Sequence, residues 1–219
     1  MSLQFISWDF FCIAFGLTLL TTFIMGLQSL NFYTLDVVKK KFSIMDLETP
    51  ATRFELVYLI RGLYKLPRAE ALKSIRSLRC QLFTDFLFMP CAYGAIYILC
   101  MLVSAKMTSY GVEFFYVLAW LQPVAWLCDI IENIYLLGKI KPHSKPSSKG
   151  VHKAYLVMEA FKWGIALVAV ISVIAAVCYF WLSGWYHLQT LYYLPIIVIE
   201  ILVFLIAAKM FLKNKEEEL

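Results

Sequence analysis

Five long apolar stretches constrain the fold of this chain more than any other feature of its sequence. A helix that crosses a membrane needs about 20 mostly apolar residues to span roughly 30 Å of hydrocarbon. The stretches cover approximately residues 5–30, 81–105, 112–138, 158–182 and 188–212, and each is long enough to cross with some tilt. The sequence therefore predicts an all-α fold, a polytopic bundle of five transmembrane helices in a single membrane domain over residues 1–219.

Composition excludes the main alternatives to a membrane protein. Hydrophobic residues make up 62% of the chain and charged residues 16%, against roughly 45–50% and 25% in a typical soluble domain. A soluble protein of this length has too little interior to bury so much apolar surface. The six cysteines form no CxxC pair, so we expect neither a disulfide scaffold nor a structural zinc site.

Lysine and arginine residues are concentrated in alternate connections between the predicted spans. The connection over residues 31–80 carries ten of them and that over 139–157 carries five, whereas 106–111 carries one and 183–187 none. Because basic loops tend to stay in the cytoplasm, we expect the N-terminus outside and both basic loops and the C-terminus in the cytoplasm. The net charge of +5 then reflects topology, and no nucleic-acid partner is expected.

The first basic loop, residues 31–80, contains signals for amphipathic helices. Thr52 and Glu55 have the spacing of a capping box at a helix start, and Pro67 separates this helix from a second helical stretch that begins at Arg68 and runs into the second span. Three basic residues recur on one side of that stretch: Lys73, Arg76 and Arg79. Cations beside anionic lipid gain about 1 kcal/mol each. Two roles are therefore open, a helix pair whose basic residues contact lipid headgroups at the inner leaflet, or charge that only sets the topology.

The second basic loop, residues 139–157, differs in composition. Residues 141–150 combine two prolines with three serines and three lysines, which is typical of a flexible connector. The chain has no internal repeat, so it lacks the inverted repeats that characterise many transporters.

Ionisable residues inside predicted spans are the best functional clues, because charge is costly in a bilayer and is therefore rare there. The candidates are Asp85, Asp129, Glu132, Glu159, Lys162 and Glu200. At a rise of 1.5 Å per residue, the first five lie at a similar level in the cytoplasmic leaflet. Glu200 lies near the bilayer midplane.

The third predicted span holds the densest group of polar residues. Asp129, Glu132 and Asn133 lie at i, i+3 and i+4 on one helical face, and Gln122 lies on roughly the same face. Two carboxylates one turn apart repel each other, so they must share a proton, bind a cation or pair with a base. Lys162 of the fourth span is the natural counter-ion.

Asp85 of the second span is expected to join this group. A connection of about six residues links the second and third spans, so the two should pack as antiparallel neighbours. Asp85, Asp129 and Glu132 would then form one site that binds a cation or another ligand. An alternative is equally open, in which carboxylates this close to the helix ends reach interfacial water or pair with nearby lysines.

Glu200 is flanked by several turns of apolar residues on both sides. An ionised carboxylate costs about 2.5–3.5 kcal/mol at the centre of a membrane helix even on a lenient scale. We therefore expect Glu200 to be protonated and to face another span, with Tyr93, Gln122 or a similar group as its hydrogen-bond partner. Its role is either an interhelical contact worth roughly 1 kcal/mol or a deeper proton relay from the acidic group.

Three short segments resemble a pattern found in uncharacterised bacterial multi-pass membrane proteins. They are residues 79–88, which precede and include Asp85, residues 129–133, and the loop residues 42–48. The resemblance implies a bacterial inner membrane and no particular activity. It also draws attention to Glu48 as a further acid of the group in the inner leaflet.

Three classes of function are open. The acids could bind a cation, a proton or a lipid headgroup in a transport or accessory role, or they could serve an enzyme that acts on a lipid at the cytoplasmic leaflet. The third class is a structural subunit of a larger complex. No histidine lies in a span and no HExxH, GxSxG or Walker motif occurs, so we favour the non-catalytic binding role. The sequence identifies no cofactor and no metal. Membrane lipids are expected partners, and a homo-oligomer or a larger membrane complex is open.

The predicted topology can be tested with single cysteines introduced into a variant that lacks the six native ones. In intact cells, an impermeant thiol reagent should label Ser183→Cys but should label Ser148→Cys only after the membrane is permeabilised, because the basic loops are predicted to be cytoplasmic. Labelling of Ser148→Cys from outside would contradict the topology.

Overall fold

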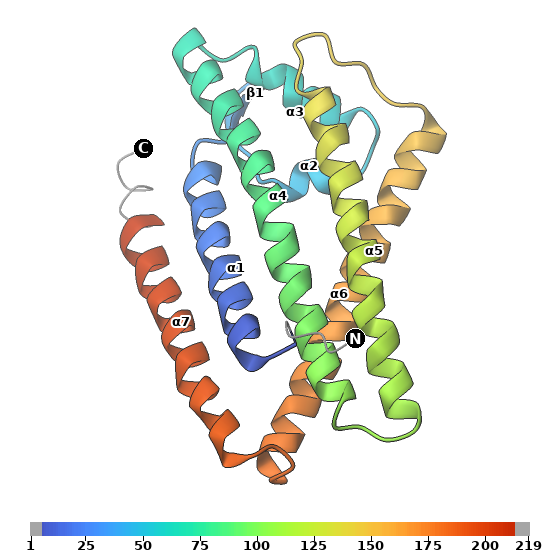
Figure 1. The fold of residues 1–219 in the computed structure, drawn as a ribbon. Helices are drawn as coiled ribbons and strands as arrows, with labels where there is room; N and C mark the ends of the chain where they lie inside the picture. Colours follow the sequence, from blue (N-terminus) through green and yellow to red (C-terminus); the bar gives the residue numbers. More distant parts are fainter. Residues whose placement is uncertain (1–5, 213–219) are drawn as a thin grey trace.

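The structure, a computed structural model, describes residues 6–212 and consists almost wholly of helices (Figure 1). Within these residues, five helical stretches are long and apolar enough to cross a membrane: α1 (Trp8–Ser29), α4 (Arg68–Ser104), α5 (Tyr110–Lys139), α6 (Lys149–Leu182) and the stretch Leu188–Phe211. The predicted all-α bundle of five apolar helices is confirmed, and it is compatible with a multi-pass membrane protein. Residue 5, the start of the first predicted span, lies outside the described residues.

The last stretch combines three kinds of helix. A 3-10 helix (Leu188–Tyr192) leads into α7 (Tyr193–Ala207), and a π-helical turn (Ala208–Leu212) follows. α7 packs against α1, α1 against α4, α4 against α5, and α5 against α6, which also contacts α4. Figure 1 shows α7 at the outer edge beside α1. Since α7 has no buried residue, the packed part of the bundle consists of α1, α4, α5 and α6.

Two helices extend beyond the predicted spans. α4 begins at Arg68, as the predicted helical stretch before the second span requires, and continues to Ser104. α6 begins at Lys149 rather than near residue 158, because the Ser148 side chain caps its first turn by accepting a hydrogen bond from the Val151 amide at 3.3 Å. The connection between α5 and α6 is therefore shorter than predicted.

Both basic loops lie at one end of the bundle, which we call the loop end, and the short turns lie at the other, the turn end (Figure 1). The first loop contains an antiparallel pair of strands, β1 (Tyr33–Leu35) and β2 (Lys39–Lys41), followed by the helices α2 (Met45–Glu48) and α3 (Glu55–Leu63). The strand pair was not predicted. Gly62 of α3 permits the close approach of β1 to α3, because a Cβ at this position would collide with the Thr34 hydroxyl group.

The amphipathic helix α3 packs on protein. As the capping box predicts, the Thr52 hydroxyl accepts a hydrogen bond from the Glu55 amide at 3.3 Å. Three buried apolar residues of α3 share one cluster with residues from α4 and α5: Leu56, Ile60 and Leu63 with Leu78, Leu82 and Leu136. The apolar side of α3 therefore packs on the loop-end parts of α4 and α5. The position of this helix pair at the inner leaflet stays a prediction.

The proline- and serine-rich connector is tied to two helices. Arg61 of α3 donates two hydrogen bonds to the Ser144 carbonyl group, at 3.1 and 2.8 Å. The hydroxyl groups of Tyr135 and Ser147 lie 2.6 Å apart. Composition alone predicts a flexible connector. It does not reveal these contacts, because the side chains that hold the connector belong to other parts of the sequence.

Aromatic side chains pack together at the turn end. The Trp8 ring stacks on those of Trp181 and Tyr193, with centroid distances of 5.2 and 5.9 Å. Tyr186 meets Trp8 edge-on at 5.5 Å. These contacts join the start of α1 to the end of α6 and the start of α7.

Candidate functional site

The ionisable side chains within the bundle centre on Lys162 of α6. Its Nζ atom lies 2.5 Å from Asp129 Oδ1 and 3.0 Å from Glu159 Oε2, and it also pairs with Glu132. Lys162 is only 4% exposed. The ammonium group expected to be the counter-ion of the α5 acids therefore serves three carboxyl groups.

The period of the α-helix positions these groups. Asp129 and Glu132 lie one turn apart on α5, and Glu159 and Lys162 lie one turn apart on α6. Residues three or four positions apart share a helical face. Because α5 and α6 pack against each other, the two pairs meet in the contact between the helices.

Hydrogen bonds connect this group to α4. The Tyr93 hydroxyl donates to Asp129 Oδ2 at 2.6 Å. The Asn133 side-chain amide of α5 donates to Asp85 Oδ2 of α4, also at 2.6 Å. The structure thus brings Asp85, Asp129 and Asn133 together across the contact between α4 and α5.

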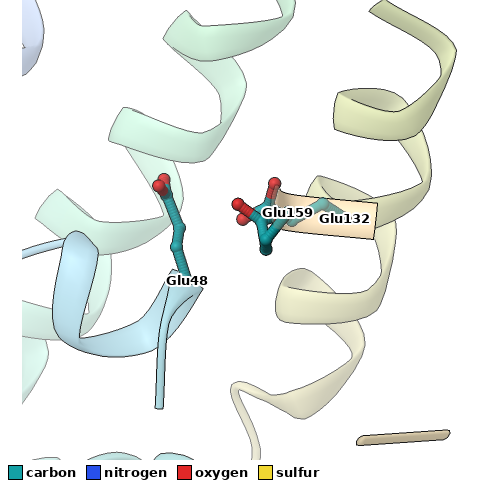
Figure 2. A group of neighbouring side chains, drawn as sticks. All are labelled: Glu48, Glu132 and Glu159. Carbon is teal, nitrogen blue, oxygen red and sulfur yellow. The ribbon is translucent and has the colours of Figure 1, made fainter. Parts of the chain in front are cut away.

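Glu48 of α2 adds a carboxyl group from the loop end. Carboxylate oxygens of Glu48, Glu132 and Glu159 all lie within 4.8 Å of one another. Figure 2 shows Glu48 on one side of this group and Glu132 and Glu159 together on the other. The Tyr155 hydroxyl lies 3.2 Å from Glu132 Oε1 and 3.3 Å from the Leu47 carbonyl oxygen, and so links α6 to α2.

Carboxyl groups outnumber cations in this acidic group, which we define as five acids around the single ammonium group of Lys162: Glu48, Asp85, Asp129, Glu132 and Glu159. If all were ionised, four negative charges would be uncompensated. Burial of an unpaired charge costs several kcal/mol. Glu159 shows the imbalance most clearly, because it is 2% exposed and its Oε1 atom has no hydrogen-bond partner among the described residues.

A cavity of about 430 Å³ adjoins the acidic group. Residues of α1, α4 and α6 line most of it, and Ile44, Met45 and Glu48 of the α2 region line its side toward the loop end. Its polar lining consists mainly of six side chains: Glu48, Gln81, Asp85, Tyr93, Asp129 and Lys162. This acidic cavity gives a small ligand space beside the carboxyl groups.

Two residues of the site, one acid of the group and one tyrosine beside it, were not predicted as site residues. Glu159 was recognised only as an acid in the fourth span, and Tyr155 was missed. Tyr155, Glu159 and Lys162 lie at i, i+4 and i+7 and therefore share one face of α6. This spacing was not recognised, because the span was predicted to begin near residue 158, three positions after Tyr155.

Gln122 and Glu200 do not join the acidic group. Gln122 donates a hydrogen bond to the Leu118 carbonyl of its own helix at 3.0 Å. Glu200 lies on α7 and faces α1, where a Cβ on Gly16 would lie 2.8 Å from its Oε1 atom. The expected bond from Glu200 to Tyr93 or Gln122 is not formed, because Tyr93 donates to Asp129 and Gln122 to Leu118, and α7 packs mainly on α1.

The surroundings of Glu200 do not connect with the acidic group. Glu200 lines a separate cavity of about 190 Å³ between α1 and α7. In the part of the chain that the structure describes, no residue lines both this cavity and the acidic cavity. The geometry therefore gives no support to a proton relay between Glu200 and the acids around Lys162.

The three basic residues predicted to contact lipid headgroups lie in the first turns of α4. Lys73, Arg76 and Arg79 are exposed at the loop end. Arg79 also donates a hydrogen bond to the Ile140 carbonyl at 3.3 Å. Contact with headgroups stays a prediction for all three.

No protein-family model, no curated protein and no solved structure matches this chain. The resemblance to bacterial multi-pass membrane proteins therefore stays a prediction.

The ion pairs of Lys162 predict a large loss of stability for Lys162→Met. The substitution leaves Asp129, Glu132 and Glu159 buried without their cation, so we expect the free energy of unfolding to fall by about 3–5 kcal/mol. The fall in the free energy of unfolding is measured by unfolding the protein purified in detergent. Lys149→Met, at the exposed first residue of α6, is the matched control and should change stability by less than about 0.5 kcal/mol. Equal effects of the two substitutions would contradict the central role of Lys162.

Glu48 predicts a pH dependence of stability. Burial raises the pKa of its carboxyl group from an ordinary value of 4.5 to about 7, an effect that Lys162 opposes and that Glu159 and Asp85 reinforce. Between these pH values the folded protein binds the proton more tightly than the unfolded chain does. The contribution of protonated Glu48 to the free energy of unfolding is therefore complete below about pH 4.5 and is lost as the pH rises through about 7.

Glu48→Gln should remove this contribution. Between pH 5 and pH 8, the free energy of unfolding of the variant should rise relative to that of the unmodified protein by on the order of 2 kcal/mol. Thermal unfolding with a chelator present measures this difference. Glu113→Gln, which changes an exposed carboxyl group near the turn end, should leave the pH profile unchanged. Identical profiles for Glu48→Gln and the unmodified protein would refute the shifted pKa.

Proposed function

We propose that this chain is a multi-pass membrane protein that binds a cationic ligand in the acidic cavity, in a transport or accessory role and without catalysis. The observation that carries the proposal is the excess of five carboxyl groups over one ammonium group, together with the unpartnered and buried Oε1 atom of Glu159. A cation bound beside Glu48, whose carboxylate oxygen lies within 4.8 Å of those of Glu132 and Glu159, would compensate the charge and give the Glu159 Oε1 atom a partner.

The donor set suits two kinds of cation. Carboxylate oxygens are the preferred ligands of hard divalent ions such as Mg²⁺, Ca²⁺ and Mn²⁺, and the oxygens of Glu48, Glu132 and Glu159 are close enough to share one ion. An organic ammonium group can use the same carboxylates as acceptors of charge-assisted hydrogen bonds, as the Lys162 side chain already does.

The basic loops support a cytoplasmic position for the loop end, since lysine and arginine gather there. The acidic cavity would then open toward the cytoplasmic leaflet, in a bacterial inner membrane if the sequence resemblance holds. The exposed residues Lys73, Arg76 and Arg79 would contact anionic headgroups at that level.

Cation binding can be measured directly on the chain purified in detergent and freed of metal by a chelator. Mn²⁺, Ca²⁺ and methylammonium are each titrated while thermal unfolding is recorded, and bound Mn²⁺ is counted by electron paramagnetic resonance. A ligand that binds only the folded state stabilises it by about 2.7 kcal/mol at a concentration of 100 times Kd. We expect saturable stabilisation by at least one of these cations.

Matched variants test whether the acidic group is responsible. Glu159→Gln should weaken cation binding by about tenfold or more, a change of at least 1.4 kcal/mol, and Glu113→Gln should leave it unchanged. If Glu159→Gln does not fold, Glu48→Gln serves instead, because Glu48 is only half-buried and lies outside the long helices. The proposal fails if the unmodified protein binds none of the cations, or if loss of the carboxylate has no effect.

A further inference from the structure

A second cavity, of about 410 Å³, continues the acidic cavity toward the turn end. Ala92, Ile96 and Val170 line both cavities, so the two meet at these three side chains. Among residues 6–212, no charged side chain lines the second cavity, and apart from Thr18 and Cys178 its lining is aliphatic and aromatic. We call it the apolar cavity.

The two cavities form one path between the same three helices. On α6 the lining begins at Lys162 in the acidic cavity and ends at Trp181 in the apolar cavity. These positions are separated by about 28 Å at 1.5 Å per residue, close to the roughly 30 Å of a bilayer's hydrocarbon core. α1 and α4 line the path along its length as well, and α7 contributes to the apolar cavity alone.

The apolar cavity reaches from the surface of the bundle, where Ile174 and Leu194 of its lining are exposed, into the interior. Val173 is 1% exposed and Ala95 is 5% exposed, although both line it. Protein interiors are normally close-packed, with few voids larger than a water molecule, and the side chains around a void lose dispersion contacts. A hydrocarbon chain would restore those contacts, whereas a polar ligand would find no hydrogen-bond partner along most of this lining.

We propose that the two cavities together bind one amphiphile from the membrane, with a primary ammonium headgroup among the acidic residues and a single hydrocarbon tail in the apolar cavity. The inference rests on the proposed cation site and names the class of its ligand. The excess of carboxyl groups around Lys162 selects a positive headgroup and repels a carboxylate or a phosphate. The uncharged lining beyond Ala92 selects a hydrocarbon tail.

A series of three probes separates the contributions of headgroup and tail. Hexadecylamine carries both, hexadecanol has the same tail without the charge, and butylamine has the same headgroup with a short tail. Binding to the full chain, delipidated in a neutral detergent, is measured by native mass spectrometry. We expect one hexadecylammonium ion per chain, bound more tightly than either of the other probes by about tenfold or more.

Two substitutions from Ala to Phe locate the tail. Ala95→Phe places a ring in the apolar cavity and should reduce the affinity for hexadecylammonium to that for butylammonium. Ala175→Phe adds the same ring on an exposed position of α6 that lines neither cavity, and it should have no effect. If Ala95→Phe does not fold, the probe series on the unmodified protein decides the question alone.

The outcomes distinguish this inference from the proposed function. Equal affinities for hexadecanol and hexadecylammonium would overturn the headgroup assignment, and unchanged binding to folded Ala95→Phe would overturn the tail assignment. If Mn²⁺ or methylammonium binds but hexadecylammonium binds no more tightly than butylammonium, the amphiphile is refuted and the cation site stands. If no cation binds, both proposals fail.

Discussion

The ion pairs between Lys162 and three carboxyl groups are the interaction on which the centre of the bundle depends. They join α5 to α6, and Tyr93 and Tyr155 extend the connection to α4 and α2. A buried ion pair is often no more stabilising than well-packed apolar side chains of similar volume, although loss of one partner is severe. The stability of the bundle therefore comes from its apolar helix contacts. We infer that the ion pairs fix the register in which α5 and α6 meet.

The loop end is part of the site. Leu47 of α2 is fully buried in the cluster that α3 covers, and the adjacent Glu48 is thereby directed toward Glu132 and Glu159. Ile44 and Met45 line the acidic cavity beside Glu48. Since α2 has only four residues and cannot be stable as an isolated helix, its position depends on this packing. Changes in α3 far from any carboxyl group would thus alter the acidic cavity through Leu47.

Hydropathy and helical spacing predicted the elements and much of the acidic group, because both depend on short-range order in the sequence. The five long helices and the pairing of Lys162 with the α5 acids follow from residue periods and matching depth. The partners of Glu200 could not be predicted in this way, because they depend on which helices are neighbours in space. Tyr155 was missed because the start of α6 is set by the Ser148 cap, outside the apolar stretch. The cavities depend on the rotation of each helix about its axis, which a nearly uniform apolar sequence does not define.

The two halves of the path between α1, α4 and α6 are each incomplete in a different way. Around Lys162, carboxyl groups are in excess, and each that is buried and ionised without a partner destabilises the fold. Around Val173, the lining lacks contacts that a close-packed interior would provide. A bundle built only for stability would have apolar residues in the first region and larger side chains in the second. Because the two regions adjoin at Ala92, an occupant with a cation at one end and hydrocarbon at the other offsets both deficits at once. A metal ion or a neutral lipid chain would offset only one of them.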